Sequence, residues 1–134
     1  MAGPEQIRDL MPFAALIGAE LTEATPEVVR GRLDWAPERC TAGGLRHGGA
    51  LMSLADGAGG ALAFLNLPEG ATGTATIESK TNFLRGVREG TVTSTTRPLH
   101  RGRTMIVIET ELTDEQGRLV AKVTQTQAFH YPRA

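Results

Sequence analysis

The chain has 134 residues, of which 40% are hydrophobic and 22% are charged. This length and composition fit one globular domain, residues 1–134, and exclude a disordered chain. The formal net charge of −1 provides no overall attraction for nucleic acid or for an anionic membrane, so we expect neither as a partner. Cys40 is the single cysteine, which excludes an internal disulfide. A lone thiol, together with residues 1–6 that lack signal-peptide character, leads us to expect a cytoplasmic protein.

The first third of the chain predicts a short helix, two strands and a loop. Residues 5–18 have a helical apolar pattern that Pro12 should interrupt. Strands are expected near residues 17–23 and at residues 28–35, because both segments are apolar and β-branched in part. Residues 37–46 should form an irregular loop, since they contain proline and end in glycines.

Residues 47–66 are predicted to form one long helix. At 1.5 Å per residue it would be about 27–30 Å long. At 100° per residue, Asp56 lies about 140° round the helix from Leu51 and therefore well off the apolar stripe. The stripe consists of Leu51, Leu54, Ala55, Ala58, Leu62 and Leu65.

Three glycines, Gly57, Gly59 and Gly60, interrupt this helical segment. Each is unfavourable in a helix by roughly 1 kcal/mol relative to alanine. Close approach of a ligand or a second backbone would explain them, and so would helix-on-sheet packing within the chain. The glycines alone leave both explanations open.

The rest of the chain predicts about four antiparallel strands. With the two earlier strands they would form a curved antiparallel sheet wrapped around the long central helix, which is an α+β fold. One helix cannot cover both faces and both edges of such a sheet, so we predict a homo-oligomer. The expected strands are residues 74–84, 90–99, 105–112 and 119–129, with turns at residues 100–103 and 114–117.

The start of the long helix, His47-Gly48-Gly49, is a candidate oxyanion site. The first turn of a helix has N–H groups without internal acceptors, and the helix dipole adds positive charge there. The alternative is that this segment has no binding role and is only a flexible turn into the helix.

Asp56 could attack a carbonyl or activate water, as hydrolysis of a thioester requires. Gly49 and Asp56 are about 10 Å apart along the axis, so both could reach one carbonyl only across two subunits.

Residues 47–56 resemble the HGG-x6-D signature of hotdog-fold acyl-CoA thioesterases, in particular the PaaI-like (phenylacetate-degradation) branch. Residues 82–85, 102–104 and 114–121 resemble further segments of that branch, and the resemblance extends over roughly residues 15–130. It implies a hotdog dimer, often paired into a tetramer, with active sites at the dimer interface. It also implies hydrolysis of acyl-CoA without a metal or other cofactor.

The resemblance also implies roles for individual residues. Asp56 would be the nucleophile or general base, and the N–H of Gly48 at the helix start would polarise the carbonyl. His47 would arrange the loop, and Thr76 would supply a hydroxyl near the carboxylate. Thr41 stands where the family commonly has asparagine, and its hydroxyl lacks the amide donor.

Arginines offer a rim for the phosphates of CoA, because the guanidinium binds phosphate with a planar fork. We expect Arg85, Arg101 and Arg103, together with Asn82, to bind substrate, although exposed charges are usually only solvated. No metal-ligand spacing occurs, so no metal site is expected. Two rival functions remain: a hotdog enoyl-CoA hydratase or dehydratase, and a non-catalytic acyl-CoA sensor.

Overall fold

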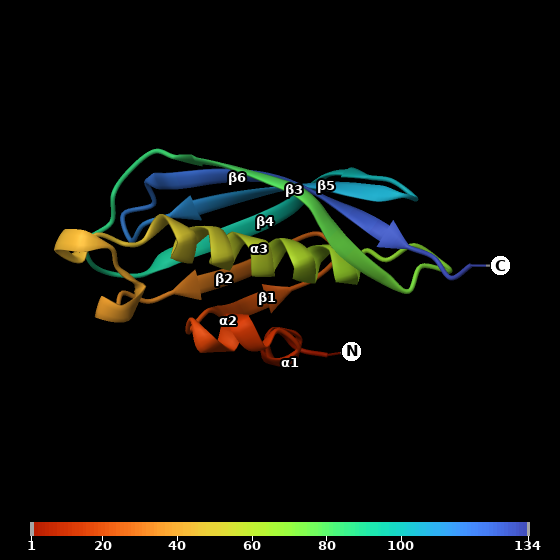
Figure 1. The fold of residues 1–134 in the computed structure, drawn as a ribbon, viewed down its shortest axis with the longest axis horizontal. Coiled ribbons are helices and arrows are strands. Elements are labelled where there is room, and N and C mark those ends of the chain that lie inside the picture. The colour runs from red at the N-terminus through yellow and green to blue at the C-terminus, as the bar shows by residue number, and fades with distance from the viewer. Residues whose placement is uncertain (1, 134) are drawn as a thin grey trace.

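The computed structural model describes residues 2–133 as a six-stranded antiparallel sheet curved around one long helix (Figure 1). The expected α+β architecture is therefore confirmed. The strands follow the order β1-β2-β4-β5-β6-β3, which places β1 and β3 at the two edges. Their bounds are β1 Glu20–Ala24, β2 Val29–Leu33, β4 Val92–Arg101, β5 Met105–Thr113, β6 Leu119–His130 and β3 Gly73–Phe83.

The N-terminal helical segment is divided as expected. Helix α1 covers Pro4–Asp9 and helix α2 covers Pro12–Leu16, so Pro12 begins the second helix, where its missing N–H costs nothing. The strand expected near residues 17–23 begins later, because Gly18 adopts φ 79° and turns the chain before β1. The loop before the long helix contains two short 3₁₀ turns, Pro37–Arg39 and Ala42–Gly44.

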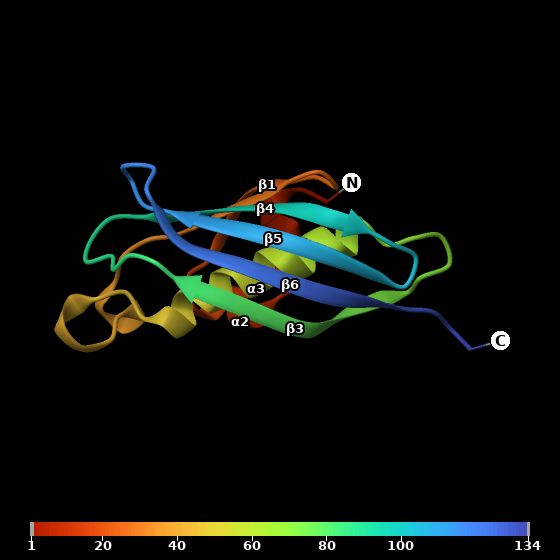
Figure 2. The same cartoon turned by 90° about the horizontal axis from the view of Figure 1, so that it is seen from above.

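The long helix, α3, covers Gly48–Leu65 and fills the concave side of the sheet (Figure 2). Leu51, Leu54 and Leu62 are almost fully buried against the strands, as the apolar stripe predicted. The helix has the length and apolar composition of a membrane-spanning helix, but so does the core helix of many globular proteins. Here the sheet wraps around it, and its stripe forms the core of the domain.

The edge strand β3 differs from the rest of the sheet. It pairs with β6 over most of its 11 residues, yet most of its side chains are exposed. A bulge at Ile77 interrupts the register between Thr76 and Glu78, and Ile77 is 57% exposed. An exposed edge strand of this length presents unpaired backbone groups that proteins usually cover.

One predicted turn is displaced. Residues 100–103 were expected to form it, but β4 continues through Arg101 and the turn follows at residues 102–104. A register shift between Pro98 and His100 lets β4 extend alongside β5 beyond the proline. Arg101 therefore belongs to a strand end rather than to a turn.

Candidate active site

The side chain of His47 caps α3. Its Nδ1 accepts a hydrogen bond of 2.8 Å from the N–H of Gly49, while its carbonyl accepts from Ala50 and Leu51. The Nδ1 atom must be unprotonated to accept, so His47 is the neutral tautomer with hydrogen on Nε2. Gly49 was expected to contribute to the oxyanion site, but its N–H is already engaged. Within residues 2–133, the N–H of Gly48 has no hydrogen-bond partner and is the donor that stays available at the helix start.

Phe83 covers the helix start from β3. A Cβ built on Gly48 would lie 3.0 Å from Cζ of Phe83, so a larger residue would displace the ring. Gly48 and Phe83 face a cavity of about 420 Å³. Its wall also includes Thr41 and Arg85, so the structure brings three predicted site residues together: Thr41, Gly48 and Arg85.

Arg46, directly before His47, holds this loop in place, a role that no local pattern indicated. It is 3% exposed, and its guanidinium donates to the carbonyl oxygens of Leu33 at 2.9 Å and Gly90 at 2.6 Å. Its backbone N–H donates to the carbonyl of Val87. Burial lowers the pKa of Arg46. Burying a guanidinium is costly, and the three backbone carbonyls that Arg46 contacts hold the segment before His47 in place.

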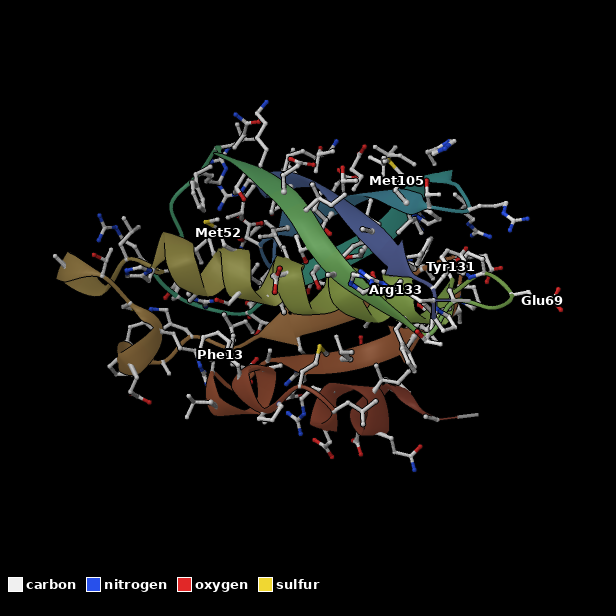
Figure 3. The ribbon with its side chains drawn as sticks, turned by 45° about the vertical axis from the view of Figure 1, so that its right-hand side comes forward. Phe13, Met52, Glu69, Met105, Tyr131 and Arg133 are labelled. Atoms are coloured by element: carbon white, nitrogen blue, oxygen red, sulfur yellow. The ribbon has the colours of Figure 1, made fainter. Side chains whose placement is uncertain are left out.

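Asp56 projects from the middle of α3 and is exposed, as its position off the apolar stripe predicted. Partial burial of the carboxyl group by the surrounding protein nevertheless raises the pKa of Asp56. A carboxylate with a raised pKa is a better base than a free aspartate. Met52 on α3 and Phe13 on α2 border this open side of the helix, and they are 39% and 59% exposed (Figure 3).

The three glycines within α3 have different surroundings, so their presence has different explanations. A Cβ on Gly59 would lie 2.2 Å from Nε2 of Gln125, so this glycine admits a side chain of the sheet. A Cβ on Gly60 would meet no atom within 4 Å, and one on Gly57 would only touch Met11. Packing within the chain therefore explains Gly59, whereas Gly60 leaves space on the open face beside Asp56.

Thr76 lies on the inner face of β3, and its hydroxyl accepts a hydrogen bond of 2.6 Å from Nε2 of Gln127. Nothing in the alternation of β6 marked Gln127 as part of a site. Gln127 and Gln125 lie in the strand expected at residues 119–129, and both are buried.

The other predicted substrate-binding residues lie away from Gly48. Arg101 donates to the carbonyl of Pro26, which also accepts from Asn66 just after the end of α3. Arg101 is therefore at the opposite end of the protomer from the helix start, and Arg103 follows in the next turn. Asn82 alternates with Phe83 on β3 and so points to the outer face of the sheet.

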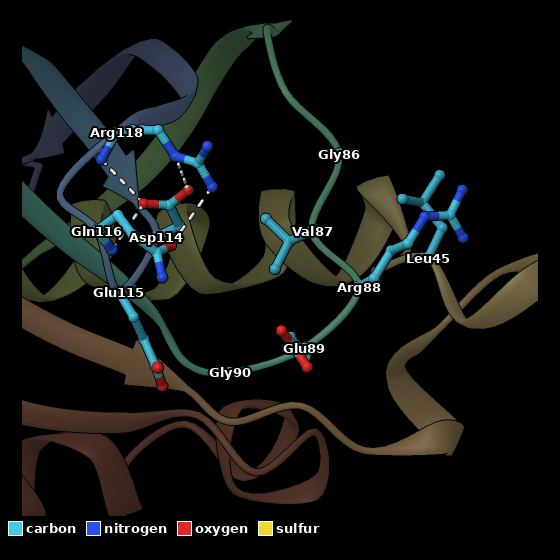
Figure 4. A pocket seen from close by; sticks show the side chains of 10 residues that line it. All are labelled: Leu45, Gly86, Val87, Arg88, Glu89, Gly90, Asp114, Glu115, Gln116 and Arg118. Atoms are coloured by element: carbon cyan, nitrogen blue, oxygen red, sulfur yellow. Dashed lines mark hydrogen bonds and ion pairs between the residues drawn. The ribbon is translucent and has the colours of Figure 1, made fainter.

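A larger cavity of about 800 Å³ adjoins the first one (Figure 4). Leu45, Gly86 and Val87 line both cavities, so the two lie side by side. At its far side Asp114 forms an ion pair of 2.8 Å with Arg118, which closes the β5–β6 turn. Arg88, Glu89 and Glu115 give the remaining wall a mixed charge.

The comparison with protein families decides the identity of the fold. A family model described as the thioesterase superfamily matches residues 43–121, which include the helix start, Asp56 and β3. The chain belongs to the thioesterase superfamily. This confirms the expected hotdog fold and, at the level of the family, the expected thioester hydrolase.

Individual members of the thioesterase superfamily agree with this assignment. Rv1847 of Mycobacterium tuberculosis, which carries an esterase name, is 30% identical over 121 residues, 89% of this chain and 86% of that protein. The 1,4-dihydroxy-2-naphthoyl-CoA hydrolase of Escherichia coli is 38% identical over 86 residues, 64% of this chain and 62% of the hydrolase. A thioesterase structure from Streptococcus pneumoniae with coenzyme A shares the fold, with a TM-score of 0.82, 24% identity and coverage of 96% and 99%.

Proposed function

We propose that this protein hydrolyses acyl-CoA thioesters to a free acid and CoA. Asp56 would act as the nucleophile or general base, and the N–H of Gly48 would stabilise the oxyanion. The observation that carries the proposal is the capped start of α3, where His47 engages the N–H of Gly49 and leaves that of Gly48 available. A fixed donor in a partly closed cavity is the type of group that stabilises a developing oxyanion.

The proposed site requires two copies of the chain. Gly48 and Asp56 are eight residues apart on one helix, which is about 12 Å along the axis. One thioester carbonyl cannot contact both within a protomer. A two-fold dimer formed through the exposed edge of β3 would set the helix start of one copy against Asp56 of the other. We also propose that two such dimers form the tetramer.

The cavity next to Gly48 suits the CoA portion of the substrate. Arg85 lines it and would contact a phosphate, and the adjoining larger cavity offers room for the nucleotide. Arg101 and Arg103 lie at the other end of the protomer and would reach the same substrate only from a second copy. The names of two relatives support the substrate class: one is a CoA hydrolase, and another was solved with coenzyme A.

In the proposed reaction the carbonyl oxygen of the thioester accepts from Gly48. Asp56 of the other copy either attacks the carbonyl carbon or takes a proton from a water molecule that attacks it. The thiolate of CoA leaves in either case, and the acid remains. Asn82 faces away from this centre, so substrate binding by Asn82 stays a prediction. The PaaI-like branch and a cytoplasmic location are parts of the same proposal.

A panel of aliphatic and aromatic acyl-CoAs, followed by release of free thiol, tests the proposal. We expect turnover by the wild type and a loss of about 10²–10⁴-fold in kcat for Asp56→Asn. Glu109→Gln is the matched control, since Glu109 pairs with Lys122 on the outer face of the sheet, away from the β3 edge. Thiol release unaffected by Asp56→Asn would refute the assignment. Hydration of an enoyl-CoA, or binding without turnover, would replace it with one of the two rival functions.

A further inference from the structure

Two buried glutamines lie between the sheet and the middle of α3. Gln125 and Gln127 on β6 are 0% and 2% exposed, and they are linked to each other and to both neighbouring elements. Nε2 of Gln125 donates to the carbonyl of Ala55 at 3.2 Å. Nε2 of Gln127 donates to Oε1 of Gln125 at 2.8 Å and to the hydroxyl of Thr76 at 2.6 Å. The hydroxyl of Thr74 completes the set by donating to Oε1 of Gln127 at 3.1 Å.

The direction of every hydrogen bond in this network follows from one fixed group. The carbonyl of Ala55 can only accept, so the atom of Gln125 facing it must be the amide nitrogen. Oε1 of Gln125 then faces Gln127 and can only accept, which makes Nε2 of Gln127 the donor. The same nitrogen donates its second hydrogen to Thr76. The hydroxyl of Thr76 therefore accepts from inside the domain, and its own hydrogen points elsewhere.

The helix is built to accommodate this chain of hydrogen bonds. A Cβ on Gly59 would lie within 2.6 Å of three atoms of the Gln125 amide. Glycine at this position is unfavourable for the helix, and burying two amides beneath it is unfavourable as well. The combination indicates that the amides serve the site rather than the core.

Thr76 stands beside the part of α3 that carries Asp56. Phe83 packs on Gly48 at one end of β3, and Thr74 shares an apolar pocket with Gly60 and Phe64 toward the other end. The strand therefore runs antiparallel along the helix. Thr76 falls between these two contacts, next to the middle of the helix. Thr76 is exposed in the single protomer, and its hydroxyl donates to no group within residues 2–133, so its hydrogen is available to a group on this side of the helix.

We propose that Gln127 is a positioning residue that fixes the hydroxyl of Thr76 as a hydrogen-bond donor into the groove beside Asp56. The donor would hold an oxygen of the reacting group, either the carboxylate of Asp56 or the water that it activates. Gln125 and Ala55 set the direction of the hydrogen bonds in this network, and the absence of a Cβ at Gly59 leaves space for the Gln125 amide. This inference rests on the proposed thioester hydrolysis and adds Gln127 to that site, behind the Thr76 hydroxyl that the resemblance already implied.

A double-mutant cycle on thioester hydrolysis tests the inference. A hydrogen bond to a charged group corresponds to about 10–100-fold in rate, so we expect Thr76→Val to lower kcat by that factor. Gln127→Met should lower kcat similarly while leaving KM little changed. The double variant should be no slower than Thr76→Val, because Gln127 acts only through that hydroxyl. Thr76→Ser should restore kcat, but only when Gln127 is present.

Thr126→Val is the matched control, since it removes a hydroxyl from β6 on the opposite face of the sheet. Its kcat should equal that of the wild type. If Gln127→Met does not fold, Gln125→Met replaces it: this variant removes the acceptor that orients the Gln127 amide and should lower kcat only while Thr76 is present. Thermal melting identifies the folded variants.

Three outcomes would overturn the inference. The first is full activity of Thr76→Val, and the second is a double variant whose loss equals the product of the single losses. In both, hydrolysis that still depends on Asp56 would leave the proposed function intact. The third outcome, no thiol release by the wild type from any acyl-CoA, would overturn the proposed function and this inference together.

Discussion

The two ends of the proposed site are built in opposite ways. At the start of α3, His47 caps the helix, Phe83 covers Gly48, and Arg46 ties the loop to the end of β2 and to residues 87–90. In the middle of the helix, Asp56 stands on an open face beside a long exposed edge strand. The oxyanion donor is therefore preorganised by one chain. In the proposed dimer, the carboxylate that acts on the same carbonyl would come from a second chain.

This difference explains why the pKa of Asp56 is already raised in a single protomer. The helix and its neighbours remove part of the water around the carboxyl group without supplying a charged partner. Covering the open face with a second copy would remove more water. The carboxylate would become more basic at the time when the site is completed, which suits a general base.

Mutations at the start of α3 should reduce the stability of the protein more than mutations near Asp56. Arg46→Met would leave the carbonyls of Leu33 and Gly90 buried without their donors, so we expect a loss of about 2–3 kcal/mol in the free energy of unfolding. Denaturant unfolding measures it. Arg88→Met is the matched control, because exposed Arg88 donates to only one carbonyl, that of Gly43, and its loss should cost under about 0.5 kcal/mol. Equal effects of the two variants would contradict the idea of a locked helix start.

Mutation of Asp56, in the middle of α3, should change stability only slightly, and it should increase stability rather than reduce it. A raised pKa means that the folded state disfavours the ionised form of Asp56. This penalty is absent at a pH below the pKa of the unfolded chain, where both states are protonated. It grows as the pH rises and is complete above the folded pKa. Asp56→Asn should therefore raise Tm near pH 7, on the order of 1–2 °C, and the gain should vanish in acid. A lower Tm at pH 7 would show that Asp56 is stabilising.

Local sequence patterns were sufficient for much of this fold. The apolar stripe of α3 and the position of Asp56 off that stripe follow from helical geometry alone, and both are confirmed. Pro12 was correctly expected to divide the N-terminal helix. These features depend on residues within a few helical turns of one another, so the local sequence pattern is sufficient to predict them.

Other parts of the site depend on long-range packing that no local pattern indicates. Arg46 looked like an ordinary loop charge, but its partners lie 13 and 44 residues away. Gln125 and Gln127 alternate like any half-buried strand, and only the fold places Ala55 and Thr76 beside them. The engagement of Gly49 by His47 is local, yet it depends on a side-chain rotamer that residue type does not determine.

Subunit complementation tests the two-chain site most directly. Asp56→Asn removes the carboxylate, and Gly48→Val displaces Phe83 and blocks the donor, so each variant alone should be inactive. If the dimers are unfolded and refolded as an equal mixture, half of them should pair one variant with the other, and each mixed dimer would contain one intact site. The account predicts recovery of about one quarter of wild-type turnover. A mixture as inactive as its components, in which mixed dimers are shown to form, would contradict it.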